Sequence, residues 1–240
     1  MRGPLAIMML TATVAAAAPP KKIPAPCTGC TLDLPAEAEG AVPLVVLLHG
    51  DRQAATSIEA WWKKAVLARG WALLALQCPR DQKCGDSYWR WDGDPQWVSD
   101  QVAAVGKQVA LDPARRFLVG WSGGASWIGE RAQAWEPVFA AVVIHGGGIA
   151  PRDAGCPARG LPAYFLVGDK NPLHGHGREL RAYFDACKAD VMWDLVEGAA
   201  HDGEEDALTR SPHKADAILD WLGAHARPAS PPGAEPRIRQ

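Results

Sequence analysis

The chain lacks the features that identify several large classes of protein. Its formal net charge is only −2 and its pI is near 6.4, so nothing favours a nucleic-acid or acidic-membrane partner. No internal repeat is present, and no segment after the N-terminus is apolar over a length that would cross a membrane. Phenylalanine and tyrosine are scarce, at four and three residues, whereas tryptophan occurs eleven times. What remains is an ordinary globular composition, 48% hydrophobic, which suits one domain with a sizeable core.

The N-terminus has the pattern of an export signal. Arg2 supplies a short positive region, residues 5–18 are apolar, and the alanines at 15–18 offer small-residue cleavage sites. This apolar stretch is shorter than the roughly 20 residues of a membrane span. We therefore expect a signal peptide over residues 1–18, a secreted or periplasmic protein, and no stable membrane insertion after cleavage. The alternative is a disordered or interfacial N-terminal tail.

The six cysteines, an even number, fit disulfide bonding in an exported chain. Local pairing is the simplest of the possible arrangements. The expected bonds are Cys27–Cys30, Cys78–Cys84 and Cys156–Cys187. The first pair also has the spacing of a redox pair or of half a zinc site, but no βαβ context surrounds it and no second pair has metal spacing. A structural disulfide is favoured, and no metal site is predicted.

Apolar runs alternate with helical patterns along the chain, which indicates an α/β fold with a mostly parallel, doubly wound sheet and helices on both faces. We expect strands over residues 43–48, 71–76, 116–119, 140–144, 163–168 and 191–196. We expect helices over residues 56–69, 96–110, 123–134, 177–188 and 212–225. The first helix has Glu59 three residues after Thr56, which is the spacing of a capping box.

Residues 41–226 are therefore expected to form one α/β domain. The proline-containing stretch 19–40 is expected to be an exposed lead-in that contains one edge strand or none. The Pro-rich tail, residues 227–240, is expected to be disordered.

The most informative segment is the pentapeptide Gly120-Trp121-Ser122-Gly123-Gly124. A serine between an apolar strand and a helix is the context of a nucleophile elbow. The turn is so tight that side chains two residues before and two after the serine would collide, and glycine occupies both positions. The serine then stands at a helix N-terminus, where amides and the helix dipole favour the negative charge of acyl transfer. Ser122 is therefore the candidate nucleophile.

Two downstream residues complete the order of a catalytic triad. Asp169 follows the expected strand 163–168, and His201 follows the expected strand 191–196. Serine, acid and histidine, each after a strand, stand in the chain order of the α/β-hydrolase triad. We predict that His201 takes the proton from Ser122 and that Asp169 orients the imidazole.

Upstream, the buried strand 43–48 ends in His49-Gly50, where such folds place the second oxyanion-hole amide. The expected donors are the backbone N–H groups of Gly123 and Asp51. The Asp51 side chain is unusual at this place, because a carboxylate near an oxyanion opposes its charge unless the side chain turns outward.

With these residues in this order, the chain from about residue 40 to 226 resembles an α/β-hydrolase. It most resembles the compact secreted esterases related to polyhydroxybutyrate depolymerases and feruloyl esterases, which have a cysteine- and tryptophan-containing loop before the helix that leads to the elbow strand. That place is held here by Cys84-Gly85-Asp86-Ser87-Tyr88-Trp89-Arg90-Trp91. The resemblance implies a serine hydrolase that cleaves carboxylic esters through an acyl-enzyme, with no cofactor and no metal ion.

Trp89 and Trp91 of this loop, and Trp121 of the elbow, are candidate walls of a substrate pocket. Trp89 and Trp91 are equally candidates for core packing. The insertions between elements are short, so no lid is expected, which favours small-molecule or polymer-end esters over bulk lipid. The triad does not distinguish an esterase from a peptidase or an acyltransferase, and a non-catalytic binding protein on the same fold is the alternative from another class.

Overall fold

The computed structural model describes residues 21–37, 40–85, 88–89, 92–152 and 154–228. Over these residues the chain forms an eight-stranded sheet with the order β1-β2-β4-β3-β5-β6-β7-β8. The strands are β1 (Lys21–Lys22), β2 (Thr31–Leu34), β3 (Val42–Leu48), β4 (Ala72–Leu76), β5 (Leu111–Trp121), β6 (Ala141–His145), β7 (Ala163–Gly168) and β8 (Val191–Val196). The helices are α1 (Ala55–Ala68), η1 (Arg80–Gln82), α2 (Gln96–Gly106), α3 (Gly123–Glu130), α4 (Ala132–Trp135), α5 (His174–Ala186), α6 (His201–Thr209) and α7 (Pro212–Ala224).

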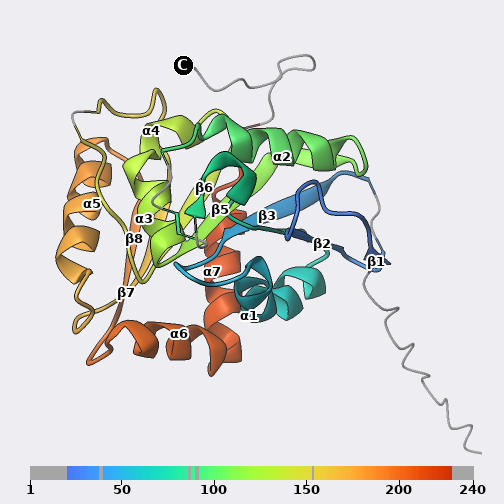
Figure 1. Cartoon of the computed structure of the whole chain (residues 1–240). Coiled ribbons are helices and arrows are strands. Elements are labelled where there is room, and N and C mark those ends of the chain that lie inside the picture. Colours follow the sequence, from blue (N-terminus) through green and yellow to red (C-terminus); the bar gives the residue numbers. More distant parts are fainter. Residues whose placement is uncertain (1–20, 38–39, 86–87, 90–91, 153, 229–240) are drawn as a thin grey trace, which may run out of the picture.

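The sheet is mostly parallel, as the alternation of strands and helices predicts. Strands β3 to β8 pair in parallel, whereas β2 pairs antiparallel with β4, and β1 with β2. Helices connect most of the successive parallel strands and cover both faces of the sheet (Figure 1), whereas the described residues between β6 and β7 contain no helix. The expected α/β class is confirmed.

Two hydrophobic cores lie on the two faces of the sheet. Because strand side chains alternate, Leu44, Val46 and Leu48 of β3 join one core, whereas Val45 and Leu47 join the other. Buried residues of α2, α3, α4 and α5 complete the first core, and those of α1, α6 and α7 complete the second. This two-sided burial explains why the strands are continuous apolar runs.

The N-terminal lead-in is less exposed than the sequence predicts. It supplies β1 and β2, and Leu32, Asp33 and Leu34 are buried. Asp33 forms an ion pair of 2.8 Å with Lys63 of α1, which in turn bonds Glu59 at 2.8 Å. The prediction of a capping box is therefore wrong: α1 begins without a side-chain cap, and Glu59 belongs to this partly buried charge cluster.

The helices differ from the expectation in several further places: α2 ends at Gly106 rather than near residue 110, and α5 begins at His174 rather than near residue 177. The helix expected over residues 123–134 is divided into α3 and α4 at Arg131. Helix α6 was not expected at all, because its residues are mostly polar. The three expected disulfide bonds, Cys27–Cys30, Cys78–Cys84 and Cys156–Cys187, are present.

The predicted signal peptide lies outside the described residues, and so does most of the predicted tail. The first residue of that tail is bound to the domain, because the Arg227 N–H donates to the carbonyl of Ala114 at 2.8 Å and its Nη1 donates to that of Pro137 at 3.0 Å. Within the described ranges, no helix combines the length and the apolarity that crossing a bilayer requires.

Candidate active site

Ser122 lies on a sharp turn between β5 and α3, at the carboxyl edge of the sheet (Figure 1). Its φ of 52° and ψ of −110° fall in a region that residues other than glycine rarely adopt. A Cβ atom on Gly120 would lie 2.6 Å from the backbone of Gly124 and Ala125, and one on Gly124 would collide with the carbonyl oxygen of Leu48. The two glycines therefore permit the strained turn, as the sequence indicates.

The hydroxyl of Ser122 faces His201, the first residue of α6. Its Oγ lies 2.9 Å from His201 Nε2, and His201 Nδ1 lies 3.2 Å from Oε2 of Glu204. His201 and Glu204 are three residues apart on one helix, so the helix itself sets their relative position. The Glu204 side chain is 0% exposed, whereas that of His201 is 33% exposed. Serine, imidazole and buried carboxylate thus form a continuous array.

Asp169 does not occupy the position predicted for it. Its Oδ1 accepts the backbone N–H of Gly198 at 2.7 Å, and its Oδ2 lies 3.9 Å from Nζ of Lys170. Among the described residues it forms no hydrogen bond or ion pair with His201. Asp169 joins the loop after β7 to the turn after β8, and Glu204 supplies the carboxylate that meets the imidazole.

Side-chain hydrogen bonds hold Glu204 in place. Its Oε1 accepts the N–H of Gly168, and its Oε2 accepts the Nδ2–H of Asn171 at 2.6 Å. Asn171 Oδ1 accepts the N–H of Leu173 at 2.8 Å, which turns the amide nitrogen toward Glu204. The patterns in the sequence predict a role for neither Glu204 nor Asn171. The spacing His201-x-x-Glu204 on one helix face was the signal that could have identified the carboxylate.

His145 fixes the backbone of the same helix. Burial lowers the pKa of His145 to about 3, so the ring is neutral at neutral pH. Its Nε2–H donates to the carbonyl oxygen of Glu204 at 3.0 Å. The start of α6 is therefore docked on the sheet through the main chain as well as the side chain of Glu204.

The two expected oxyanion donors are neighbours. Gly123 opens α3, and Asp51 follows β3 by three residues. A Cβ atom on Gly123 would collide with Oδ1 of Asp51, and this oxygen also accepts the N–H of Trp89 at 3.2 Å. The Asp51 carboxylate therefore does not turn outward and lies beside the expected oxyanion site.

His49 supports the turn that contains Asp51. Burial lowers the pKa of His49 to about 4, so this ring is also neutral at neutral pH. Its Nδ1–H donates to Gly50 O at 2.7 Å, and its Nε2 accepts from the N–H of Cys78 at 3.1 Å and from Nε2 of Gln77 at 3.0 Å. His49 thus joins the carboxyl ends of β3 and β4.

Two of the three tryptophans expected to form pocket walls lie among the described residues, and both are buried. Trp89 is 1% exposed and packs against His49 and Trp127, each with ring centroids 5.3 Å away. Trp121 is 3% exposed and stacks on the His201 ring. Trp91 lies outside the described residues. Burial supports core packing for Trp89, and neither described indole forms the wall of an open pocket.

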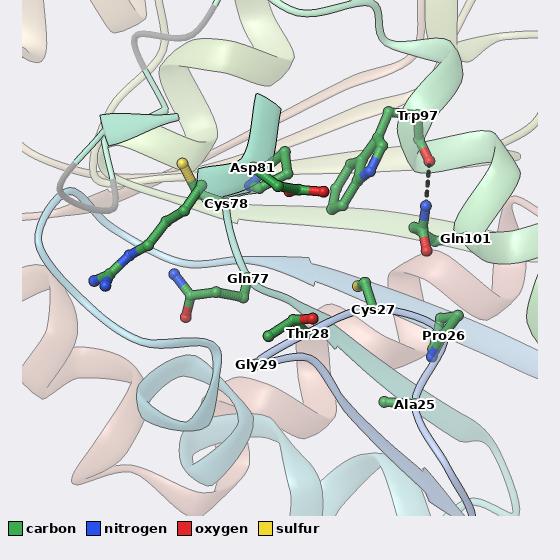
Figure 2. A pocket seen from close by; sticks show the side chains of 12 residues that line it. Ala25, Pro26, Cys27, Thr28, Gly29, Gln77, Cys78, Asp81, Trp97 and Gln101 are labelled. Carbon is green, nitrogen blue, oxygen red and sulfur yellow. Dashed lines mark hydrogen bonds between the residues drawn. The ribbon is translucent and has the colours of Figure 1, made fainter. Parts of the chain in front are cut away.

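A pocket of about 1000 Å³ lies at the carboxyl end of β4 (Figure 2). It is lined by Ala25, Pro26, Cys27, Thr28, Gly29, Gln77, Cys78, Pro79, Arg80, Asp81, Trp97 and Gln101. Leu48 of β3 pairs with both Leu76 of β4 and Gly120 of β5, so pocket and elbow share one edge of the sheet. The pocket at β4 and the elbow at the end of β5 are separated by two strand spacings, which is about 10 Å. Gln77 both lines the pocket and bonds His49, which connects the pocket to the oxyanion turn.

Residues 30–156 match the family model described as esterase PHB depolymerase, which is more than half of the 240-residue chain. The chain belongs to this esterase family. The match includes the elbow and the His49-Gly50 turn of the esterase and ends before α6. No curated protein matches the chain in sequence.

Solved structures of esterases and hydrolases share the fold of this esterase. A thermostable esterase has a TM-score of 0.62 at 18% identity, and the alignment covers 87% of this chain but only 63% of that one. A Bacillus cereus carboxylesterase has a TM-score of 0.62 at 14% identity, with 82% and 93% covered. S-formylglutathione hydrolase from Staphylococcus aureus has a TM-score of 0.65 at 12% identity, with 88% and 99% covered. At these identities the likeness shows the α/β-hydrolase fold alone.

Proposed function

We propose that this esterase hydrolyses carboxylic esters through an acyl-enzyme on Ser122, with His201 as the general base and acid and Glu204 as the carboxylate that orients the imidazole. The observation that carries the proposal is the array of hydroxyl, imidazole and buried carboxylate, with distances of 2.9 and 3.2 Å, on a strained elbow. The reaction needs these side chains, backbone amides and water.

In the acylation step, Ser122 Oγ attacks the ester carbonyl carbon while its proton passes to Nε2 of His201. The tetrahedral intermediate has a negative oxygen, and we assign its stabilisation to the backbone N–H groups of Gly123 and Asp51. Collapse of the intermediate breaks the bond to the alkoxy oxygen, and the alcohol leaves with the proton from His201. A water molecule then repeats the sequence and releases the acid, which restores the Ser122 hydroxyl.

Glu204 fits the orienting role because His201 must present Nε2 as an acceptor to Ser122 and therefore has its proton on Nδ1. That N–H points to Oε2 of Glu204 at 3.2 Å. Asn171 Nδ2 lies 3.1 Å from the same nitrogen, but two donors cannot bond each other. Asn171 instead holds Glu204 in place, and the buried carboxylate stabilises the imidazolium that forms during attack.

The position of Asp51 yields a prediction of increased activity. Asp51→Asn removes a negative charge beside the oxyanion site but keeps the backbone N–H and an oxygen that can accept from Trp89. We expect kcat to rise about three- to tenfold, because the carboxylate opposes the developing oxyanion. The measurement is kcat for p-nitrophenyl acetate at neutral pH. Asp202→Asn removes an exposed carboxylate on α6 and is the matched control, and an unchanged or lower kcat in Asp51→Asn would contradict the argument.

The pocket beside β4 suits the part of the substrate that extends away from the scissile bond. Figure 2 shows Asp81 directed toward the Trp97 indole, above Gln77 and Thr28 in this view. One arginine and one aspartate line the pocket together with amide groups, so its lining is polar without a net charge. This supports neutral small-molecule or polymer-end esters as substrates.

We propose that the esterase is exported. Three disulfide bonds join all six cysteines. Cysteines that are all paired in disulfide bonds are typical of proteins in an oxidising compartment. The residues with the pattern of a signal peptide precede the described domain.

Labelling with a fluorophosphonate tests the proposed function. We expect one adduct on the purified protein, located on Ser122 by peptide mapping and lost in His201→Ala, because only a hydroxyl next to a base attacks the phosphorus rapidly. Intact mass gives the stoichiometry. A folded protein that forms no adduct would refute the nucleophile and support a binding role.

A further inference from the structure

The indole of Trp121 lies flat against the imidazole of His201. The ring centroids are 4.4 Å apart, and the planes differ by 10°. Trp121 also meets the ring of His145, with centroids 4.3 Å apart, and the edge of Trp61 at 5.5 Å. With 3% of its surface exposed, the indole is held by its neighbours on the sheet and on α1.

Two glycines make the space for this indole. A Cβ atom on Gly50 would lie 2.6 Å from Cδ1 of Trp121, and one on Gly146 would collide with the six-membered ring. Gly146 also has a φ of 64°, which favours glycine. Gly50 follows β3 and Gly146 follows β6, which are the strands on either side of β5. The ends of three adjacent strands thus form a slot for one side chain.

The catalytic imidazole depends on such a support. Its hydrogen bonds, to Ser122 and Glu204, both lie at the ring nitrogens and therefore in the plane of the ring. These hydrogen bonds limit rotation of the imidazole within its own plane, but they only weakly resist a tilt of the ring out of that plane. A flat contact on the ring face restricts the tilt. Because the face of an indole is electron-rich, the same contact stabilises an imidazolium more than a neutral imidazole.

We propose that Trp121 is a positioning residue, whose indole face keeps the His201 ring aligned between Ser122 and Glu204 and stabilises the protonated ring that forms when the ester is attacked. This inference rests on the proposed function. The other titratable groups near the ring are Asp202, Glu204 and Glu205 of α6 and His145 of β6. All four remain in a variant that changes Trp121 alone.

The test compares Trp121→Leu and Trp121→Phe in the full chain. We expect Trp121→Leu to lower kcat for p-nitrophenyl acetate about 10- to 30-fold, with KM within twofold of the wild type, because the contact acts on the charged ring. We expect the acidic limb of kcat/KM to move to lower pH, since an imidazolium without the indole loses its proton more readily. Trp121→Phe keeps an aromatic face and should recover most of kcat. Trp61→Leu is the matched control, because it removes the edge contact with Trp121 and leaves the face on His201.

Three outcomes would overturn the proposal. The first is a folded Trp121→Leu protein with wild-type kcat and an unmoved acidic limb. The second is a loss of kcat that Trp121→Phe does not recover and that leaves the acidic limb in place, which is the result of packing alone. The third covers a Trp121→Leu protein that does not fold: Trp121→Met, which has a longer side chain but no aromatic face, is then titrated by NMR of the His201 ring, and a midpoint equal to that of the wild type refutes the charge stabilisation. A wild-type protein that hydrolyses no ester refutes the proposed function instead, and the NMR titration still tests the stacking.

Discussion

Replacing Ser122 with alanine is expected to lower kcat for p-nitrophenyl butyrate by about 10⁵-fold or more, the size of effect that loss of the nucleophile has in serine hydrolases. Without Oγ no acyl-enzyme can form, and only the oxyanion donors and substrate binding remain to accelerate attack by water. We expect the melting temperature to change little, because alanine fits the same turn and, among the described residues, one side-chain hydrogen bond is lost. Steady-state kinetics and thermal unfolding of the two proteins are the measurements.

Ser126 provides the matched control for this substitution. It lies one turn further along α3, donates from Oγ to the carbonyl of Ser122 at 3.1 Å, and accepts the N–H of Gly148 at 3.3 Å. Ser126→Ala removes a hydroxyl from the same helix without removing the nucleophile, so we expect a loss of less than about tenfold. Equal losses in the two variants would contradict the assignment of Ser122.

Replacing Glu204 with glutamine is expected to lower kcat about 10³- to 10⁴-fold with little change in KM, as loss of the triad carboxylate does elsewhere. The glutamine Nε2–H₂ can face Nδ1 of His201, which favours the imidazole tautomer that cannot accept from Ser122. The buried position also predicts a lower melting temperature, because Glu204 accepts hydrogen bonds from Gly168 and Asn171. Kinetics measured well below the unfolding transition separate the two effects.

Asp169→Asn is the control that decides between the two carboxylates. Asp169 accepts a hydrogen bond from Gly198, which an asparagine oxygen can also accept, so we expect kcat to stay within about threefold of the wild type. Glu204→Asp keeps the charge but shortens the side chain, and it should fall between the wild type and Glu204→Gln. A large loss in Asp169→Asn with little loss in Glu204→Gln would reverse the proposed roles.

The central strands were predictable because β3, β4, β6 and β7 are buried on both faces, whereas the edge strand β8 is only partly buried. Residues 163–168 and 191–196 coincide with β7 and β8, and the strand expected at 43–48 differs from β3 by one residue. Continuous apolar runs of this length have few alternative structures. The elbow was equally clear, because glycine at positions 120 and 124 has a steric reason that the structure confirms.

The carboxylate of the array was harder to predict because two local patterns compete. Asp169 stands directly after β7, where the chain order of the fold places the acid. Glu204 lies in a segment that is polar in sequence and that we did not expect to be helical. Only the helix brings Glu204 back to His201, so missing α6 meant missing the carboxylate and, with it, the role of Asn171.

The aromatic residues were ambiguous for a different reason. A tryptophan beside an active site and a tryptophan in the core have the same sequence pattern, since both occur next to strand ends. Burial separates them, and burial depends on contacts between distant segments, such as those of Trp89 with His49 and Trp127. The same holds for Asp51, whose carboxylate direction is set by the backbone of Trp89.

The slot around Trp121 links three positions in the evolution of this esterase. Because Gly50 and Gly146 leave room for the indole, a larger residue at either position requires a smaller one at 121. Positions 50 and 121 should therefore vary together among homologues: a small residue at position 121 leaves room for alanine or serine at position 50, whereas position 146 keeps glycine in either case because of its positive φ. Single exchanges at these positions pass through a poorly packed intermediate, which makes the tryptophan elbow difficult to acquire or lose one step at a time.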